Sequence, residues 1–264
     1  MIIDVHTHIG KFGAETSRTP EDLLKSMDNA GIETSLVIAS SVSDEVQGLS
    51  TKQAVEVGEQ YPRLKIIGNV EYPRISIEHI QELIELLKTK KIVGVKMYTG
   101  YEHFYPNDSK LYELYRFCSD NGFPVIFHTG FLLAGSKGLL KYSHPLHIDE
   151  LAQEFPDLKI LIAHFGYPWI EDCGAVVAGN KNVYADLSAY FTEFNPISKK
   201  EQKEFTEDIG RLVSITGGFE KFLFGTDWPI YSQKEYVEAV KSLPMSKEER
   251  ELVFWKNAKS LFGV

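Results

Sequence analysis

Short apolar runs rich in β-branched residues alternate eight times with segments that carry apolar residues at helical spacing, and this alternation extends over the whole 264-residue chain. The apolar runs are typical of buried strands, and the amphipathic segments are typical of helices that cover a sheet. The expected strands cover residues 2–8, 35–40, 64–70, 92–98, 124–129, 159–164, 182–188 and 222–227. The expected helices cover residues 20–30, 51–60, 77–89, 110–121, 148–154, 168–178, 200–217 and 234–242.

The length of the repeat indicates the domain organisation. Dividing the 264 residues by eight gives about 33 residues for each strand and its helix, the size of a βαβ building block. No linker, charge run or low-complexity stretch interrupts the series. We therefore expect one domain over residues 1–264 that folds as a (β/α)8 TIM barrel, with a doubly wound open sheet as the alternative. A further helical pattern over residues 246–262 predicts an extra C-terminal helix on the outside of the barrel.

The charge balance and the apolar pattern exclude several partners. The chain has 28 basic and 37 acidic side chains, a net charge of −9 and no cluster of Lys or Arg, so nucleic acid is not an expected partner. The apolar runs are too short for a membrane span, and no secretory leader opens the chain. Two cysteines, Cys118 and Cys173, have no paired spacing, so we expect a reducing, cytoplasmic location.

Polar side chains of the metal-ligand type stand at the ends of the expected strands. Catalytic groups of a (β/α)8 barrel lie at the C-terminal ends of the strands, where the loops form the mouth of the site. Two imidazoles on one face of a strand are costly to bury without partners, so His6 and His8 together indicate a metal site. The residues at strand ends are His6, His8, Lys96, His128, His164 and Asp227.

The alternation of side chains along a strand decides which of these residues point to the barrel axis. In the fourth strand the apolar face that includes Val95 must meet the helices, so Lys96 is expected to point inward. The same count predicts that Asp4 points inward with His6 and His8 and supports the site. The residues expected to face the helices in the other strands are Ile3, Val5, Val125, Phe127, Leu161, Ala163, Phe222 and Phe224.

Five segments of the chain resemble the amidohydrolase superfamily. The resemblance is closest to the amidohydrolase-related branch, which contains aminocarboxymuconate semialdehyde decarboxylase and related metal-dependent hydrolases. It covers nearly the whole chain, and the His-x-His opening is specific because it is joined to a later His, His and Asp. The segments are Asp4-Val5-His6-Thr7-His8, Gly94-Val95-Lys96-Met97-Tyr98, Pro124-Val125-Ile126-Phe127-His128-Thr129-Gly130, Ile162-Ala163-His164-Phe165-Gly166 and Phe224-Gly225-Thr226-Asp227-Trp228-Pro229.

The resemblance implies a divalent metal ion, most often zinc, held by His6, His8, His128 and Asp227. In binuclear members of the superfamily a carboxylated lysine on the fourth strand bridges two ions, and Lys96 stands at the candidate position for it. The mononuclear branch, which these motifs resemble more, needs no such bridge. We therefore expect one zinc ion, with a second ion or Mn²⁺ as open alternatives.

The chemistry of these residues predicts a reaction class. Imidazole and carboxylate ligands suit zinc with a position left for water, whose pKa falls to about 7 on binding. Asp227 can act as the general base for this water, and His164 can contact the nucleophile or the attacked carbonyl oxygen. We therefore expect a metal-dependent hydrolase of a C–N or C–O bond in an amide, a cyclic amide or a lactone. The alternative is a non-oxidative zinc-dependent decarboxylase of a small unsaturated or aromatic carboxylic acid, and the third hypothesis is a metal-binding protein without turnover.

Candidate substrate contacts lie near the expected mouth of the barrel. Lys96 is a candidate for binding a second metal or anchoring the substrate, and Arg74 after the third strand is the other cationic candidate. Few guanidinium groups stand near the mouth, which disfavours polyanionic substrates. We expect a small-molecule substrate, and the exposed face of the final helix is compatible with a homodimer. The remaining candidate contacts are Tyr98, Tyr101, His103, Phe131, His144, Tyr167 and Trp228.

Overall fold

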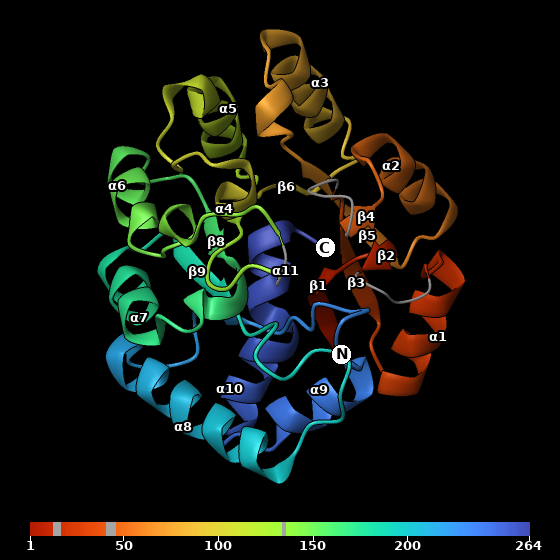
Figure 1. Ribbon diagram of the computed structural model, residues 1–264, viewed down its shortest axis with the longest axis vertical. Coiled ribbons are helices and arrows are strands. Elements are labelled where there is room, and N and C mark those ends of the chain that lie inside the picture. The colour runs from red at the N-terminus through yellow and green to blue at the C-terminus, as the bar shows by residue number, and fades with distance from the viewer. Residues whose placement is uncertain (13–16, 41–45, 134–135) are drawn as a thin grey trace.

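Eight parallel strands form a barrel that is surrounded by helices (Figure 1). The structure is a computed structural model, and it describes residues 1–264 apart from 13–16, 41–45 and 134–135. The strand order is β1-β3-β5-β6-β7-β8-β9-β10, so neighbours in the barrel are also neighbours in the chain. The expectation of a (β/α)8 barrel is confirmed. Its strands are β1 Ile3–Thr7, β3 Thr34–Ile38, β5 Leu64–Asn69, β6 Gly94–Met97, β7 Val125–Phe127, β8 Ile160–Ile162, β9 Val183–Asp186 and β10 Phe222–Leu223.

The barrel closes between its last strand and its first. The regular part of β10 is shorter than the expected strand over 222–227, but the chain beyond it continues to pair with β1. The Val5 N–H donates to the Phe224 carbonyl at 3.0 Å, and the Asp227 N–H donates to the His6 carbonyl at 2.8 Å. Backbone hydrogen bonds therefore hold β1 and the segment after β10 together at the place where the candidate ligands lie.

Helices cover the outside of the barrel, as Figure 1 shows. Thr19, Ser50 and Ser198 cap helices α1, α2 and α8, each in a reciprocal pair with the residue three positions later. The eight expected helices are present within two residues of their expected bounds. The helices are α1 Pro20–Ala30, α2 Thr51–Gln60, α3 Ile77–Lys88, α4 Thr99–Glu102, α5 Tyr112–Asn121, α6 His147–Glu154, α7 Ile170–Gly179, α8 Lys199–Thr216, α9 Gln233–Lys241, α10 Lys247–Glu251 and α11 Asn257–Phe262.

Two apolar clusters separate the inside of the barrel from its outside. The outer cluster lies between strands and helices and contains Val95, Val125, Phe127 and Phe222, as the alternation predicts. The inner cluster fills the barrel itself, and its strand residues are Ile3, Val5, Leu36, Ile38, Ile67, Ile126, Leu161 and Leu223.

The first strand departs from the expected alternation. Ile3 and Val5 belong to the inner cluster, so the prediction that they face the helices is wrong. The physical reason is a shift of register between Asp4 and Thr7 in the pairing with β3, an irregularity of the bulge type. Adjacent residues of a regular strand point to opposite faces, but this shift lets both Val5 and His6 point into the barrel.

Asp4 does not point into the barrel, so that prediction is also wrong. Its carboxylate accepts hydrogen bonds from Thr226 Oγ1 at 2.6 Å and from Gln233 Nε2 at 2.8 Å, and Gln233 is the first residue of α9. Burial raises the pKa of Asp4 to about 7, although these hydrogen bonds act in the opposite direction. Asp4 thus lies outside the cavity and connects β1 by hydrogen bonds to the segment that carries Asp227.

Strand β8 also departs from the expected alternation. Leu161 and Ala163 belong to the inner cluster, so the prediction that they face the helices is wrong. The strand ends at Ile162, and His164 and Phe165 then adopt left-handed backbone conformations with φ of 60° and 36°. Such conformations are uncommon outside glycine. This turn, rather than the alternation of a strand, directs His164 toward the barrel axis.

The C-terminal segment closes one end of the barrel rather than lying on its outside, which corrects the expectation. It is divided into α10, a π-helical turn over Leu252–Lys256, and α11. Leu261 and Phe262 of α11 join the inner cluster, and Figure 1 shows α11 at the centre of the ring of strands. Lys159, directly before β8, donates from Nζ to the Leu261 carbonyl at 3.3 Å. The helix therefore lies at the N-terminal ends of the strands, opposite the mouth.

A small two-stranded sheet, separate from the barrel sheet, was not expected from the sequence. Strands β2 Gly10–Phe12 and β4 Val46–Gly48 pair antiparallel, and each is only three residues long. Runs of this length carry too little alternation to be recognised. Among the described residues, no helix has both the length and the apolar character needed to cross a membrane.

Candidate metal centre

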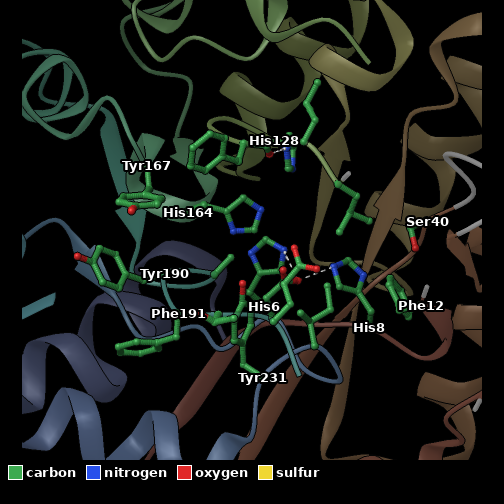
Figure 2. A pocket seen from close by; sticks show the side chains of 18 of the residues that line it. His6, His8, Phe12, Ser40, His128, His164, Tyr167, Tyr190, Phe191 and Tyr231 are labelled. Atoms are coloured by element: carbon green, nitrogen blue, oxygen red, sulfur yellow. Dashed lines mark hydrogen bonds and ion pairs between the residues drawn. The ribbon is translucent and has the colours of Figure 1, made fainter. Parts of the chain in front are cut away.

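A cavity of about 660 Å³ lies at the C-terminal ends of the barrel strands (Figure 2). Its lining includes residues at or shortly after the ends of seven of the eight strands, which is the position of active sites in this architecture. A cavity of this size accommodates a small molecule. Those strand-end residues are His6, His8, Ser40, Lys96, Tyr98, His128, His164, Ala189 and Asp227.

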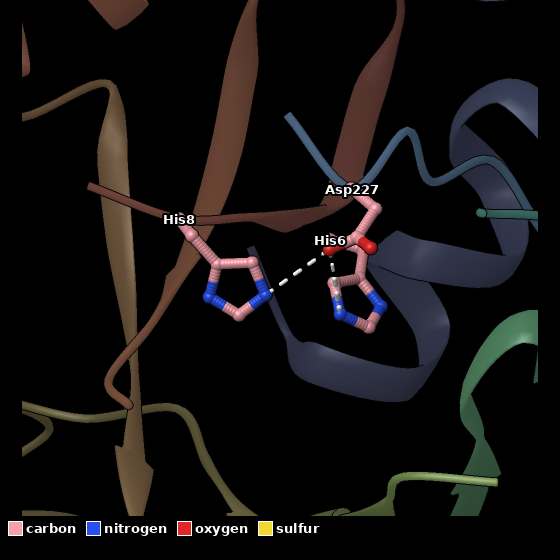
Figure 3. A group of neighbouring side chains, drawn as sticks. All are labelled: His6, His8 and Asp227. Carbon is pink, nitrogen blue, oxygen red and sulfur yellow. Dashed lines mark ion pairs between the residues drawn. The ribbon is translucent and has the colours of Figure 1, made fainter. Parts of the chain in front are cut away.

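Three ligand-type side chains converge in this cavity, as Figure 3 shows. His6 and His8 come from the end of β1, and Asp227 comes from the segment after β10. His8 Nε2 lies 3.2 Å and His6 Nε2 lies 3.6 Å from the same atom, Asp227 Oδ1. One ligand atom from each residue lies within 4.8 Å of the others, so the three atoms can share one ion.

The second ring nitrogen of each histidine already faces an oxygen atom. His6 Nδ1 lies 2.9 Å from Asp186 Oδ2, and His8 Nδ1 lies 3.1 Å from the Ile38 carbonyl oxygen. An imidazole that donates from Nδ1 keeps its lone pair on Nε2. Both Nε2 atoms therefore direct lone pairs toward a carboxylate oxygen. This arrangement fits a cation bound among the three atoms, because one ion would satisfy both lone pairs and the carboxylate oxygen together.

Asp227 is held in its ionised form beside the histidines. Burial alone would raise the pKa of Asp227, but the proximity of His8, His6 and His164 outweighs burial and holds the pKa below its usual range. The backbone of Asp227 adopts a left-handed conformation with φ of 64°, and such positions recur at functional sites. Gly225 permits this approach, because a Cβ at this position would lie 3.0 Å from His6 Cβ.

Lys96 is fully buried beside the three ligands and points inward, as expected. Its Nζ lies 3.4 Å from His6 Nε2 and 5.3 Å from the centre of the Tyr98 ring. Burial lowers the pKa of Lys96 to about 8, against the opposing effect of the Asp186 and Asp227 charges. A fraction of this lysine is therefore neutral near physiological pH.

His128 lines the cavity but lies outside the group of three. Its Nε2 lies 2.9 Å from the Phe131 carbonyl oxygen, and its ring centre lies 4.9 Å from that of His164. Burial, followed by the charge of Lys96, lowers the pKa of His128 to about 3, so the ring is neutral. Its coordination of the same ion as His6 and His8 stays a prediction.

Asp186, at the end of β9, belongs to the candidate site and was missed by the sequence reasoning. Its Oδ2 contacts His6 Nδ1, and its Oδ1 accepts hydrogen bonds from the N–H groups of His164 and Ser188 at 3.0 and 3.1 Å. Burial alone would raise the pKa of Asp186, but the contact with His6 holds it below its usual range. The available signal was its place at a strand end, which Asp227 shares.

His164 lies between His6 and His128 in the cavity (Figure 2). Its ring centre lies 4.7 Å from that of His6, and its Nδ1 lies 2.8 Å from Ser188 Oγ, which in turn donates to Asp186 Oδ1. Burial lowers the pKa of His164 well below its usual value. The ring is therefore neutral, donates from Nδ1 to Ser188 and keeps the lone pair of Nε2. With His6 and Asp186 it forms a second group able to hold a cation.

The family of the chain follows from a comparison with known sequences. The family model for amidohydrolases matches residues 3–264. The chain belongs to the amidohydrolase family. Members of this superfamily with hydrolase and decarboxylase activities are metal-dependent enzymes, and this chain is such an enzyme.

Relatives of this amidohydrolase differ in length and in reaction. The protein fluG of Emericella nidulans is 29% identical over 104 residues, which are 39% of this chain and 11% of that protein, so the match spans only a small part of fluG. A probable 2-pyrone-4,6-dicarboxylic acid hydrolase of Acinetobacter baumannii is 19% identical over 100% of this chain and 99% of that one, with a TM-score of 0.75. The 5-carboxyvanillate decarboxylase of Sphingomonas paucimobilis is 14% identical over 100% of both chains, with a TM-score of 0.71. At these identities the solved structures show a shared fold and leave the reaction open.

Five of the nine predicted substrate contacts of this amidohydrolase line the cavity. Arg74 does not, because it ends a short 3₁₀ turn at the surface, where its side chain is 83% exposed and contacts Glu71 at 3.2 Å. The predicted contacts that line the cavity are Lys96, Tyr98, Tyr101, Phe131 and Tyr167.

Three other predicted contacts are engaged elsewhere. His103 Nε2 lies 2.9 Å from the Lys137 carbonyl oxygen at the surface, and the His144 ring packs 4.5 Å from the Trp169 ring. Trp228 is buried in the outer cluster behind the cavity. None of the three is among the described residues that line the cavity, so these predicted contacts lack support in the geometry.

Several lining residues come from loops whose course the sequence did not reveal. The segment between β9 and α8 contributes the largest group, and the segment after Asp227 contributes two more. The signal was the length of the loop after the seventh strand, but a loop length does not give side-chain directions. The unexpected lining residues are Phe12, Ser40, Leu132, Leu133, Tyr190, Phe191, Thr192, Glu193, Glu201, Glu204, Ile230 and Tyr231.

Proposed function

We propose that this protein is a metal-dependent hydrolase that cleaves a C–N or C–O bond at the carbonyl carbon of a small amide, cyclic amide or lactone. The observation that carries the proposal is the convergence of His6 Nε2, His8 Nε2 and Asp227 Oδ1 within an open cavity. A structural ion is normally enclosed by four protein ligands. A group of three beside a space of about 660 Å³ instead leaves room for water and substrate.

The donor set decides which ion would fit. His6, His8 and Asp227 offer two imidazole nitrogens and one carboxylate oxygen, which suit zinc and also accept Mn²⁺. We propose one ion in this group. When bound, such an ion supplies Lewis-acid activation of a water molecule and of the substrate carbonyl.

The residues of the chain would then handle the proton. Asp227, held ionised, accepts a proton from the attacking water at a carboxylate oxygen and returns it to the leaving nitrogen or oxygen. His164 donates from Nδ1 to Ser188, so its Nε2 is left to accept a hydrogen bond from that water and orient it. We therefore assign His164 the contact with the nucleophile, one of its two expected roles.

Decarboxylation is the second candidate, and the observation that favours it is Lys96. A buried lysine 3.4 Å from His6 Nε2 can bind a substrate carboxylate next to the metal centre. Loss of CO₂ from such a carboxylate needs no attacking water, so the products distinguish the two reactions.

Metal analysis and a product screen test the proposal. Protein purified without added metal is analysed for bound ions, then loaded with zinc or manganese and assayed on amides, lactones and aromatic carboxylates. Hydrolysis without CO₂ release is the expected result. Release of CO₂ alone would replace the hydrolase with the decarboxylase, and a protein that binds no metal would contradict both.

The role of Asp227 is tested by Asp227→Asn. The amide keeps an oxygen ligand but cannot take a proton from water, so we expect turnover to fall by about 10²-fold or more while zinc stays largely bound. Asp172→Asn is the matched control, because the Asp172 side chain is 45% exposed and lies outside the lining of the cavity. Full activity of Asp227→Asn would overturn its assignment as the base.

A further inference from the structure

Charged side chains are unevenly distributed around the cavity. Apart from histidines, Lys96 is the one cation among the described residues that line the cavity, and it lies beside His6. The segments 13–16, 41–45 and 134–135 contain no Lys or Arg. Glu193, Glu201 and Glu204 line the cavity from the loop before α8 and from α8 itself. Among the described lining residues, the lysine therefore lies at the metal centre beside the Asp227 carboxylate, and three further carboxylates lie toward α8.

Two of these three acids already have partners. Glu201 accepts a hydrogen bond from the Ser198 N–H at 2.9 Å as part of the cap of α8. Glu204 lies 3.6 Å from Lys200 Nζ. The Glu193 carboxylate has neither a hydrogen bond nor an ion pair within the part of the chain that the structure describes. Glu193 is thus the acid available to a ligand.

The negative charge of Glu193 lies close enough to other cavity residues to influence their pKa values. The Glu193 side chain is exposed, but the partial burial of its carboxylate, followed by the charge of Asp227, raises its pKa. After burial and the charge of Asp227, the charge of Glu193 also raises the pKa values of Tyr101 and Tyr231, which line the same cavity. A carboxylate that lacks its own cation and is repelled by a second carboxylate favours a positive ligand beside it.

Aromatic rings form one wall of the cavity. This aromatic wall consists of Tyr167, Tyr190, Phe191 and Tyr231, and Figure 2 shows the first three together on one side of the pocket. The Tyr190 ring centre lies 4.8 Å from that of Tyr167 and 5.4 Å from that of Phe191. The Tyr190 hydroxyl donates to Asp208 at 2.7 Å, so its polar end is already used. Tyr190 and Phe191 thus offer rings without a free hydroxyl group to this side of the cavity, and aromatic faces attract cations.

We propose that the substrate carries a positively charged group, an ammonium or a guanidinium, that binds between Glu193 and the aromatic wall while its carbonyl lies at His6, His8 and Asp227. This substrate class rests on the proposed hydrolase function. An organic cation gains ion pairing from the carboxylate and cation–π attraction from the rings. The substrates are therefore amides or lactones with a basic group.

A substrate that carries a carboxylate in place of this basic group is expected to be repelled. Its distal carboxylate would face Glu193 and Glu204, and like charges placed together oppose binding. Lys96 cannot compensate there, because its Nζ lies 3.4 Å from His6 Nε2 at the metal centre. The cavity thus selects against dicarboxylic acids and for cationic compounds.

Three inhibitors with the same metal-binding head test the inference without requiring the true substrate. These are benzohydroxamic acids with a 4-aminomethyl, a 4-methyl or a 4-carboxy group, and their binding to the zinc-loaded enzyme is measured by calorimetry. The aminomethyl compound is expected to bind about tenfold more tightly than the methyl compound, and the carboxy compound more weakly than either.

The variant Glu193→Gln links the preference to one residue. It removes a negative charge from a loop without touching a metal ligand, so the preference for the aminomethyl compound should disappear while the methyl compound binds as before. Glu207→Gln is the matched control, because it removes the same negative charge at a position outside the cavity lining. Glu207 lies on α8 and pairs with Lys203 at 3.7 Å. This control should keep the full preference.

The outcomes separate the two proposals. Equal binding of the three compounds, or tightest binding of the carboxy compound, overturns the cationic substrate class and leaves the hydrolase proposal standing. A preference that survives Glu193→Gln overturns the assignment of Glu193 as the residue that binds the cation. Failure of all three compounds to bind the zinc-loaded enzyme overturns the metal centre and both proposals with it.

Discussion

Each histidine of the metal centre is oriented by the partner of its second ring nitrogen. His8 Nδ1 faces the backbone carbonyl of Ile38 in β3, which no substitution can remove. His6 Nδ1 faces the side chain of Asp186. Partners of this kind fix the ring orientation and raise the basicity of the ligand nitrogen. Asp186 is therefore the residue at which the orientation of a ligand can be tested.

The variant Asp186→Asn is expected to lower zinc affinity about 10–100-fold. The amide fills the same space and keeps an oxygen for the N–H groups of His164 and Ser188, so the fold should persist. Competition with a chromophoric chelator measures the affinity. Asp157→Asn is the control, because the Asp157 side chain is 79% exposed and pairs with Lys181 at 3.4 Å. Unchanged affinity in Asp186→Asn would mean that His6 is held by other contacts.

Glu102, the last residue of α4, is a carboxyl group whose protonation is linked to folding. Its Oε2 is buried with no hydrogen-bond partner in the described part of the chain, and burial raises its pKa from 4.5 to about 8. The folded state therefore keeps this proton at pH values where the unfolded state has lost it. The contribution of Glu102 to stability falls as the pH rises from 4.5 to about 8 and stays low above that range.

Glu102→Gln should remove this dependence. Relative to the wild type, the variant is expected to gain on the order of 2 kcal/mol in the free energy of unfolding between about pH 5 and pH 9, because a neutral amide has no proton to lose. Urea unfolding at both pH values measures the difference. Glu82→Gln, at an exposed position of α3, should show no such change. Parallel pH profiles for wild type and Glu102→Gln would contradict the linkage.

At the scale of elements, two interruptions of regular strands place histidines in the cavity. The register shift in β1 lets Val5 and His6 both point inward, and the left-handed turn after β8 does the same for His164. A pattern of alternating residues assumes an unbroken register, and a shift by one residue reverses every side chain. For this reason the sequence predicted the strands correctly but reversed the facing of Ile3 and Leu161.

Helix α11 acts as the plug of the barrel's N-terminal end. Leu261 is 2% exposed and packs with the inner cluster. We expect Leu261→Ala to lower the free energy of unfolding by about 2–5 kcal/mol, because the cavity it leaves is surrounded by rigid strands. Leu140→Ala is the control at a side chain that is 44% exposed, with a change of about 0.5 kcal/mol or less. Urea denaturation measures both. A loss as small as that of the control would mean that α11 does not close the barrel.

At the scale of the whole molecule, the sequence predicted the features that follow from the order of the strands. Eight periods predicted the closed barrel, and closure alone brings His6 from the first strand to Asp227 after the last. The sequence did not predict the side-chain directions that depend on the course of the backbone between the strands and the helices. Arg74 stands after a strand as expected, but a 3₁₀ turn directs it to solvent. Glu193 was missed because the loop that carries it has no period from which its direction follows.

The metal centre joins the first and last strands, so metal binding should stabilise the closed barrel as a whole. An ion that binds only the folded state adds about 2.7 kcal/mol at a free concentration 100 times its Kd. For a chain of this size we expect zinc to raise the melting temperature by about 5–10 °C over chelator-treated protein. His8→Ala removes one ligand and should abolish the increase, whereas His79→Ala, on helix α3 outside the cavity lining, should retain it. Scanning calorimetry measures the shift. If zinc raises the melting temperature of His8→Ala as much as that of the wild type, the ion binds elsewhere and does not connect β1 to the segment after β10.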